Sequence, residues 1–89
     1  MSAASLALTA SGQVKARPGA LVAVIITGGA DAASVTVYDN TVTSGTILAV
    51  VKAAINTTVT FCPAVPIVAS KGLYATITGT TPNVTVVFA

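Results

Sequence analysis

The most regular pattern in the chain lies near its C-terminus, where apolar and polar side chains alternate over residues 73–78 and again over residues 84–88. Period-2 alternation is typical of a β-strand with one buried face. Gly79 and Pro82 lie between the two runs and favour a turn. The pattern therefore predicts a β-hairpin whose apolar face is formed by Leu73, Ala75, Ile77, Val84, Val86 and Phe88.

Shorter segments of similar character precede this hairpin. Alternation or β-branched composition predicts strands at residues 13–17, 20–27, 34–38, 46–53, 56–61 and 67–69. Residues 20–27 (ALVAVIIT) are apolar on both faces, which predicts a central strand covered on both sides. Residues 46–53 also fit a helical spacing, but their β-branched side chains favour a strand.

This spacing of strands and turns predicts an all-β fold, a single small antiparallel β-sandwich or jelly roll of about seven or eight short strands. We place that domain at residues 14–89. Residues 1–13 have no sustained period, and they form either a first strand at 5–10 or an N-terminal arm that becomes ordered on a partner. The expected core between the two sheets includes Val37, Val59, Leu73, Ile77, Val84 and Val86.

Eight positions are expected to have structural roles in turns, since glycine, proline, aspartate and asparagine each favour turn geometry. They are Gly28, Gly29, Asp39, Asn40, Gly45, Gly72, Gly79 and Pro82. Gly72 and Gly79 flank the strand at 73–78, so we expect a positive φ or a close backbone contact at one of them at least.

Composition adds a reason to expect partners. Hydrophobic residues make up 54% of the 89 residues and charged residues only 7%, and the mean hydropathy is +0.92. A small domain of this kind would expose a largely uncharged, apolar surface, which is typical of a protein covered by other chains. A membrane span is not expected, because no apolar run approaches the roughly 20 residues that a helix needs. The N-terminus lacks the basic start of a secretory signal, so we expect a soluble chain that is made in a cytoplasm.

The charged side chains are few and scattered. Four cations against two carboxylates give a net charge of +2 and a pI near 9.0. Nucleic-acid binding requires a basic patch, usually with aromatic platforms, and neither is present in the pattern. No nucleic-acid partner is therefore expected.

The chain has little inventory for catalysis. It contains no histidine, and its only carboxylates, Asp31 and Asp39, belong to different predicted loops, where turn capping is the expected role. Cys62 has no histidine to activate it and is expected to be a small buried hydrophobe. We expect neither an enzyme nor a bound metal or cofactor. Tyr38 and Tyr74 could contact a partner, or they could simply pack flat on a sheet face.

Two segments carry a family resemblance. VTVYDNTVTSGT at 35–46 and SKGLYATITGT at 70–80 resemble small virion proteins of tailed bacteriophages, most specifically in YDNT at 38–41, SG at 44–45 and SKGLY at 70–74. The match extends over residues 19–88, although Phe88 stands where such proteins commonly have tyrosine.

The resemblance implies a structural protein of the phage particle, made in the cytoplasm of the bacterial host. A capsid decoration or cement protein is the first expectation: a homotrimer that binds the major capsid protein on the outside of the shell. The alternatives are a head-to-tail, tail or fibre-base component and, in a different class, a carbohydrate-binding surface module. The N-terminal residues expected to reach a neighbour are Met1, Ser2, Ala3, Ala4, Ser5 and Leu6.

Overall fold

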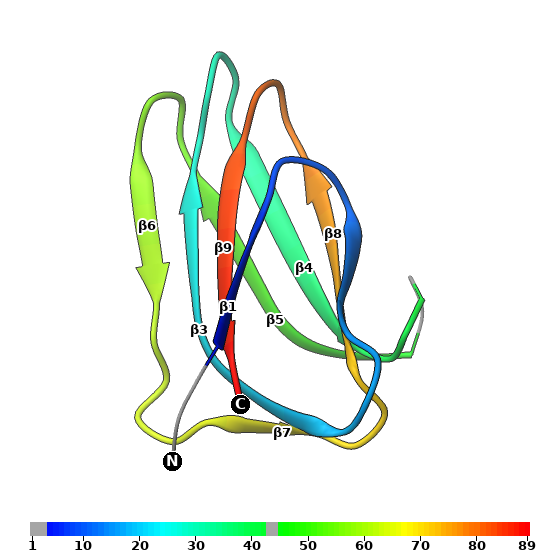
Figure 1. Ribbon diagram of the computed structural model, residues 1–89. Helices are drawn as coiled ribbons and strands as arrows, with labels where there is room; N and C mark the ends of the chain where they lie inside the picture. The colour runs from blue at the N-terminus through cyan, green and yellow to red at the C-terminus, as the bar shows by residue number, and fades with distance from the viewer. Residues whose placement is uncertain (1–3, 43–44) are drawn as a thin grey trace.

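The computed structural model describes residues 4–42 and 45–89. This part of the chain consists of antiparallel strands with connecting loops and contains no helix (Figure 1). The strands are β1 (Ala4–Leu8), β2 (Gly12–Lys15), β3 (Gly19–Thr27), β4 (Ala33–Asp39), β5 (Thr46–Ala53), β6 (Thr58–Phe61), β7 (Ile67–Ala69), β8 (Leu73–Thr78) and β9 (Asn83–Phe88). No helix in the described ranges has the length and apolar character needed to cross a membrane.

The strands form two sheets packed face to face. Sheet A has the order β1-β9-β3-β6, with β7 also pairing with β3, and sheet B has the order β2-β8-β4-β5. Figure 1 shows sheet A in front and sheet B behind it, the two layers of a β-sandwich. The predicted all-β sandwich is confirmed. The described residues contain nine strands instead of seven or eight, because residues 4–15 form both β1 and β2.

The core lies between the sheets and is entirely aliphatic. Its largest fully buried side chains are Leu21, Val24, Ile26, Val35, Val37, Leu73, Val84 and Val86. Four of the six predicted core residues are thus buried, whereas Val59 and Ile77 are half-buried and pack against the core margin. β4, β8 and β9 bury alternate residues. In β4, Val35 and Val37 point inward, and Ser34, Thr36 and Tyr38 lie on the outer face.

The predicted C-terminal hairpin is wrong. β8 pairs with β2 and β4 in sheet B, while β9 pairs with β1 and β3 in sheet A. Residues 79–82 therefore cross from one layer to the other (Figure 1). Alternation in two neighbouring runs shows that each strand has a buried face, but it does not show whether the two faces lie side by side or opposite each other.

The expected two-sided cover of residues 20–27 is also wrong. Leu21, Val24 and Ile26 of β3 are fully buried against sheet B, but Ala23 and Ile25 are only half-buried on the outer face of sheet A. Their neighbours across the strands are uncharged, with Val87 beside Ala23 and both Thr85 and Thr60 beside Ile25. The apolar outer face of β3 therefore contributes to an uncharged surface.

Other boundaries shift by a few residues. β1 starts and ends earlier than the predicted 5–10, β2 ends before Arg17, and β6 begins only at Thr58 because Asn56 turns the chain with a φ of 53°. The strand alternative for residues 46–53 is confirmed at both of its ends by β5.

Candidate functional site

The two segments that carry the family resemblance meet at one end of the sandwich. Asp39 ends β4, and its Oδ1 accepts a hydrogen bond from the backbone N–H of Lys71 at 2.8 Å. The Ser70 hydroxyl donates to Asp39 Oδ2 at 2.9 Å. The Asp39 carboxylate thus binds Ser70 and Lys71, which lie 31 and 32 positions further along the sequence. We call residues 38–41 and 70–74 together the Asp39 corner.

The contacts of Asp39 stabilise its ionised form. The Lys71 backbone N–H, followed by hydrogen bonding from Ser70, lowers the pKa of the Asp39 carboxyl below its ordinary value of 3.8. The expected turn role of Asp39 is therefore realised at long range, since the N–H it binds belongs to a distant loop and not to its own turn. Asn40 has the local role, because its Oδ1 accepts the Thr41 backbone N–H at 2.8 Å.

Two glycines allow the chain to close this corner. Gly45 has a φ of 92°, and a Cβ there would lie 3.2 Å from Asn40 Nδ2. Gly72 is buried, and a Cβ added to it would lie 2.5 Å from the carbonyl oxygen of Lys15 on β2. The expected positive φ is confirmed at Gly79, with a φ of 122°. The close backbone contact is confirmed at Gly72.

The opposite end contains the remaining predicted turn residues. A Cβ on Gly28 or Gly29 would collide with the backbone of Ala54 or Thr81, respectively. The Thr80 hydroxyl donates to Asp31 Oδ2 at 2.7 Å, so this carboxylate also joins two loops. Pro82 is buried beneath them.

Asp31 and Asp39 cannot act as a carboxylate pair. The full length of β4 separates them, and eight residues of extended chain span roughly 26 Å. No group of three or more potential metal ligands occurs in the described residues. Both carboxylates hold loops together, each at its own end of the sandwich.

Tyr38 and Tyr74 are direct neighbours on the outer face of sheet B. They oppose each other on β4 and β8, and the same face continues with Thr36 opposite Thr76 and Ser34 opposite Thr78. The Ser34 and Thr78 hydroxyl oxygens are 2.6 Å apart and share a hydrogen bond. Both tyrosines are half-buried, and the structure brings these two predicted contact residues together.

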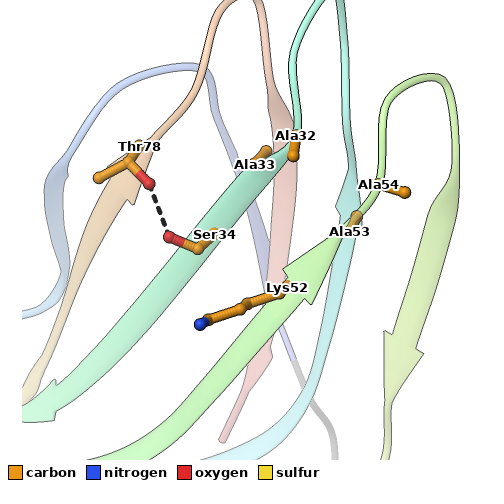
Figure 2. Close-up of a pocket in the computed structure, with 7 residues that line it drawn as sticks. All are labelled: Ala32, Ala33, Ser34, Lys52, Ala53, Ala54 and Thr78. Atoms are coloured by element: carbon orange, nitrogen blue, oxygen red, sulfur yellow. Dashed lines mark hydrogen bonds between the residues drawn. The ribbon is translucent and has the colours of Figure 1, made fainter.

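An open hollow of about 400 Å³ adjoins this face (Figure 2). Lys52 provides its only charged side chain, and the Ser34 hydroxyl within it is engaged with Thr78. The other lining residues are alanines: Ala32, Ala33, Ala53 and Ala54. No histidine, carboxylate or thiol is among the residues that line it.

The predicted N-terminal contact residues fall into two groups. Ala4, Ser5 and Leu6 belong to β1 and pair with Phe88, Val87 and Val86 of β9. Met1, Ser2 and Ala3 lie outside the described residues. Cys62 corrects a further expectation: it is exposed, not buried, because it follows Phe61 at the end of β6 and has the outward orientation of Thr60.

Sequence reasoning missed one prominent surface. Six large hydrophobic side chains are exposed in the described chain, and four of them lie within residues 42–55: Val42, Ile47, Val50 and Ile55. Ile47 and Val50 belong to β5, at the edge of sheet B, and Val42 and Ile55 lie in the loops before and after it. The available signal was the run TILAVV, which is apolar on both faces although an edge strand needs only one apolar face.

Comparison of the chain with protein-family models, with curated proteins and with solved structures finds no match. The arguments for function therefore depend on the geometry described above and on the resemblance in residues 35–46 and 70–80.

Proposed function

We propose that this protein is a structural component of a tailed-phage virion, a decoration or cement protein that binds the outside of the capsid and stabilises it. The single observation that supports this most strongly is the Asp39 corner. The two sequence segments that carry the resemblance are joined by hydrogen bonds to one carboxylate, that of Asp39, from Ser70 and Lys71, which lie 31 and 32 positions further along the chain. The resemblance thus corresponds to a structural unit of the fold and not to two unrelated strands.

The distribution of polar chemistry supports a binding role and not a catalytic one. The chain has no histidine, and its two carboxylates lie at opposite ends and hold loops in place. The exposed surface instead offers aliphatic side chains around β5 and an uncharged outer face on sheet A. Covering such surfaces with other protein chains is favourable, because it removes apolar area from water.

The mechanism in this proposal is multivalent binding. A subunit that contacts two or more copies of the major capsid protein, and that also associates with itself, makes separation of the shell require several contacts to break together. The resemblance favours a trimer for the self-association. With six charged residues in 89, the contacts gain little from electrostatic attraction, so capsid binding should depend only weakly on salt concentration.

Co-sedimentation with capsids tests the proposal. Purified protein is mixed with shells of the phage that encodes it, from which the protein has been genetically removed, and the bound fraction is measured from 50 to 500 mM salt. We expect saturable binding on the capsid surface with little change across the salt series. Localisation to the head–tail junction, the tail or the fibre base by image reconstruction would replace the cement role with the alternative virion roles.

The Tyr38–Tyr74 pair favours a second candidate, binding of carbohydrate on the outer face of sheet B. Two neighbouring aromatic rings beside rows of hydroxyl groups have the chemistry that a sugar face requires. Glycan-array binding that is lost in Tyr74→Ala but retained in Val68→Ala, a change at an exposed valine on β7, would support this role. A blank array at millimolar glycan would contradict it.

A further inference from the structure

β5 is the longest edge strand among the described residues. Five of the described strands lie at sheet edges, and β5 has eight residues whereas β1, β2, β6 and β7 have three to five. In the described part of the chain β5 pairs only with β4. The N–H and C=O groups on its other side are therefore available to another strand.

β2, at the opposite edge of sheet B, carries features that discourage pairing, and β5 largely lacks them. β2 has a bulge between Gln13 and Lys15 and ends on a charged residue. In β5 the irregularity lies near the start, opposite Val37 and Tyr38, and Ala49–Ala53 pair with β4 without interruption. Lys52 is the only charged residue in the strand, which contains no proline.

The exposed face of β5 is apolar except for Lys52, which opposes Ser34. Ile47 and Val50 are each 53% exposed. They share the outer face of sheet B because they oppose Tyr38 and Thr36, respectively. Ala49 and Val51 oppose Val37 and Val35 and point into the core. An incoming strand would therefore find both free hydrogen-bonding groups and apolar side chains to cover.

We propose that β5 pairs with β5 of a second copy of this chain, antiparallel about a two-fold axis at Val50. Residues directly opposite each other in an antiparallel pair share a face. With Val50 on the axis, Val50 meets Val50 of the other copy on the outer face, and Ala49 meets Val51 of the other copy on the core face. Two four-stranded B sheets would then become one continuous sheet of eight strands.

The charges favour a second copy as the occupant. In this register the two Lys52 residues are offset by four positions, roughly 14 Å along the strand, which exceeds the Debye length in physiological salt. The residues around Val50 carry no charge in either copy. The contact therefore does not require a partner with an opposite charge at this position. Because an edge contact buries less area than a standard interface, the dimer should form in the micromolar range and dissociate on dilution.

This inference does not depend on the virion role. A two-fold contact closes with two copies and leaves the rest of the surface free for a three-fold contact. A trimer in solution would agree with the resemblance and overturn the two-fold pairing at β5, so the outcomes for the two proposals are distinguishable.

The first test is sedimentation velocity of the full chain from 1 to 500 µM. We expect a shift from 8.7 kDa toward twice that mass as concentration rises. Val50→Lys places two like charges at the axis and should keep the protein monomeric, while its thermal melt at low concentration stays close to wild type. Val68→Lys makes the same change at a valine that is 74% exposed on β7 and should leave the dimer intact. A monomer at every concentration, an odd number of copies, or a dimer that survives Val50→Lys would overturn the proposal.

A second test fixes the register without destabilising the strand. Directly opposed residues have Cα separations of about 4.5–5.5 Å, which suits a disulfide. In a Cys62→Ser background, Val50→Cys should give a disulfide-linked dimer under mild oxidation, with at least tenfold more product than Val68→Cys. Equal yields at the two positions, or none at Val50→Cys, would contradict pairing about Val50.

Discussion

The Asp39 corner and the β5 edge belong to the same sheet and differ in how their polar groups are satisfied. At the corner, both oxygens of one carboxylate accept hydrogen bonds, and Gly72 packs directly against the backbone of β2. Along β5, one side of the strand has no partner in the described chain, and Ile47 and Val50 are exposed. The corner is completed by the chain itself, whereas the outer side of the β5 edge has no partner strand among the described residues.

The largest expected difference between the two regions is in the cost of removing a side chain. Leu73 belongs to the corner and is fully buried. Leu73→Ala should lower the free energy of unfolding by about 2–5 kcal/mol, because it removes core contacts and leaves a cavity. Val50→Ala on the β5 edge should change it by less than about 0.5 kcal/mol at concentrations where the protein is monomeric. Urea denaturation of the two variants measures both values, and similar losses would show that β5 is as well packed as the corner.

A smaller effect is expected where only one methyl group is added. In Gly72→Ala the new Cβ would lie 2.5 Å from the Lys15 carbonyl oxygen, so β2 and the corner must move apart. We expect a loss of roughly 1–3 kcal/mol. Gly12→Ala is the matched control on β2, since its nearest contact would be an ordinary 3.7 Å to Leu8. Thermal melts that fall equally for both variants would argue against a close contact specific to the corner.

The Asp39 carboxylate makes the corner sensitive to acid. Because the folded protein holds the pKa of Asp39 below 3.8, its contribution to stability is fully present above the unfolded pKa. That contribution is lost as pH falls through the lower folded value. Asp39→Asn should reduce stability at neutral pH and flatten the fall in melting temperature below pH 4. If the melting temperature of this variant falls below pH 4 as steeply as that of the wild type, other groups determine the acid sensitivity.

The sequence predicts strands well and their partners poorly. Period-2 alternation located β4, β8 and β9 to within a residue or two because each strand buries one face, whereas β5 was assigned from its β-branched side chains. The same alternation would occur whether residues 79–82 joined two strands of one sheet or crossed between sheets, so the hairpin prediction failed. Whether a side chain in the predicted core is fully buried, like Val37, or marginal, like Val59, depends on its distance from the edge of the sheet.

In the candidate site, too, local features could be predicted from the sequence, whereas contacts between distant residues could not. Gly72 and Gly79 could be singled out from their positions beside a strand. The partners of Asp39 could not, because they lie 31 and 32 residues away and are set by the tertiary fold. The run TILAVV shows that β5 is apolar on both faces. The sequence does not show that β5 lies at a sheet edge, because apolar residues on both faces fit burial inside one chain and burial between two.

We propose that this protein holds the subunits of a capsid together. The most direct measurement compares phage particles with and without the protein by the temperature at which they release DNA. We predict that particles lacking it release DNA at a lower temperature, and that adding purified protein restores the higher value. Equal release temperatures, with the protein located on the tail, would contradict the cement role.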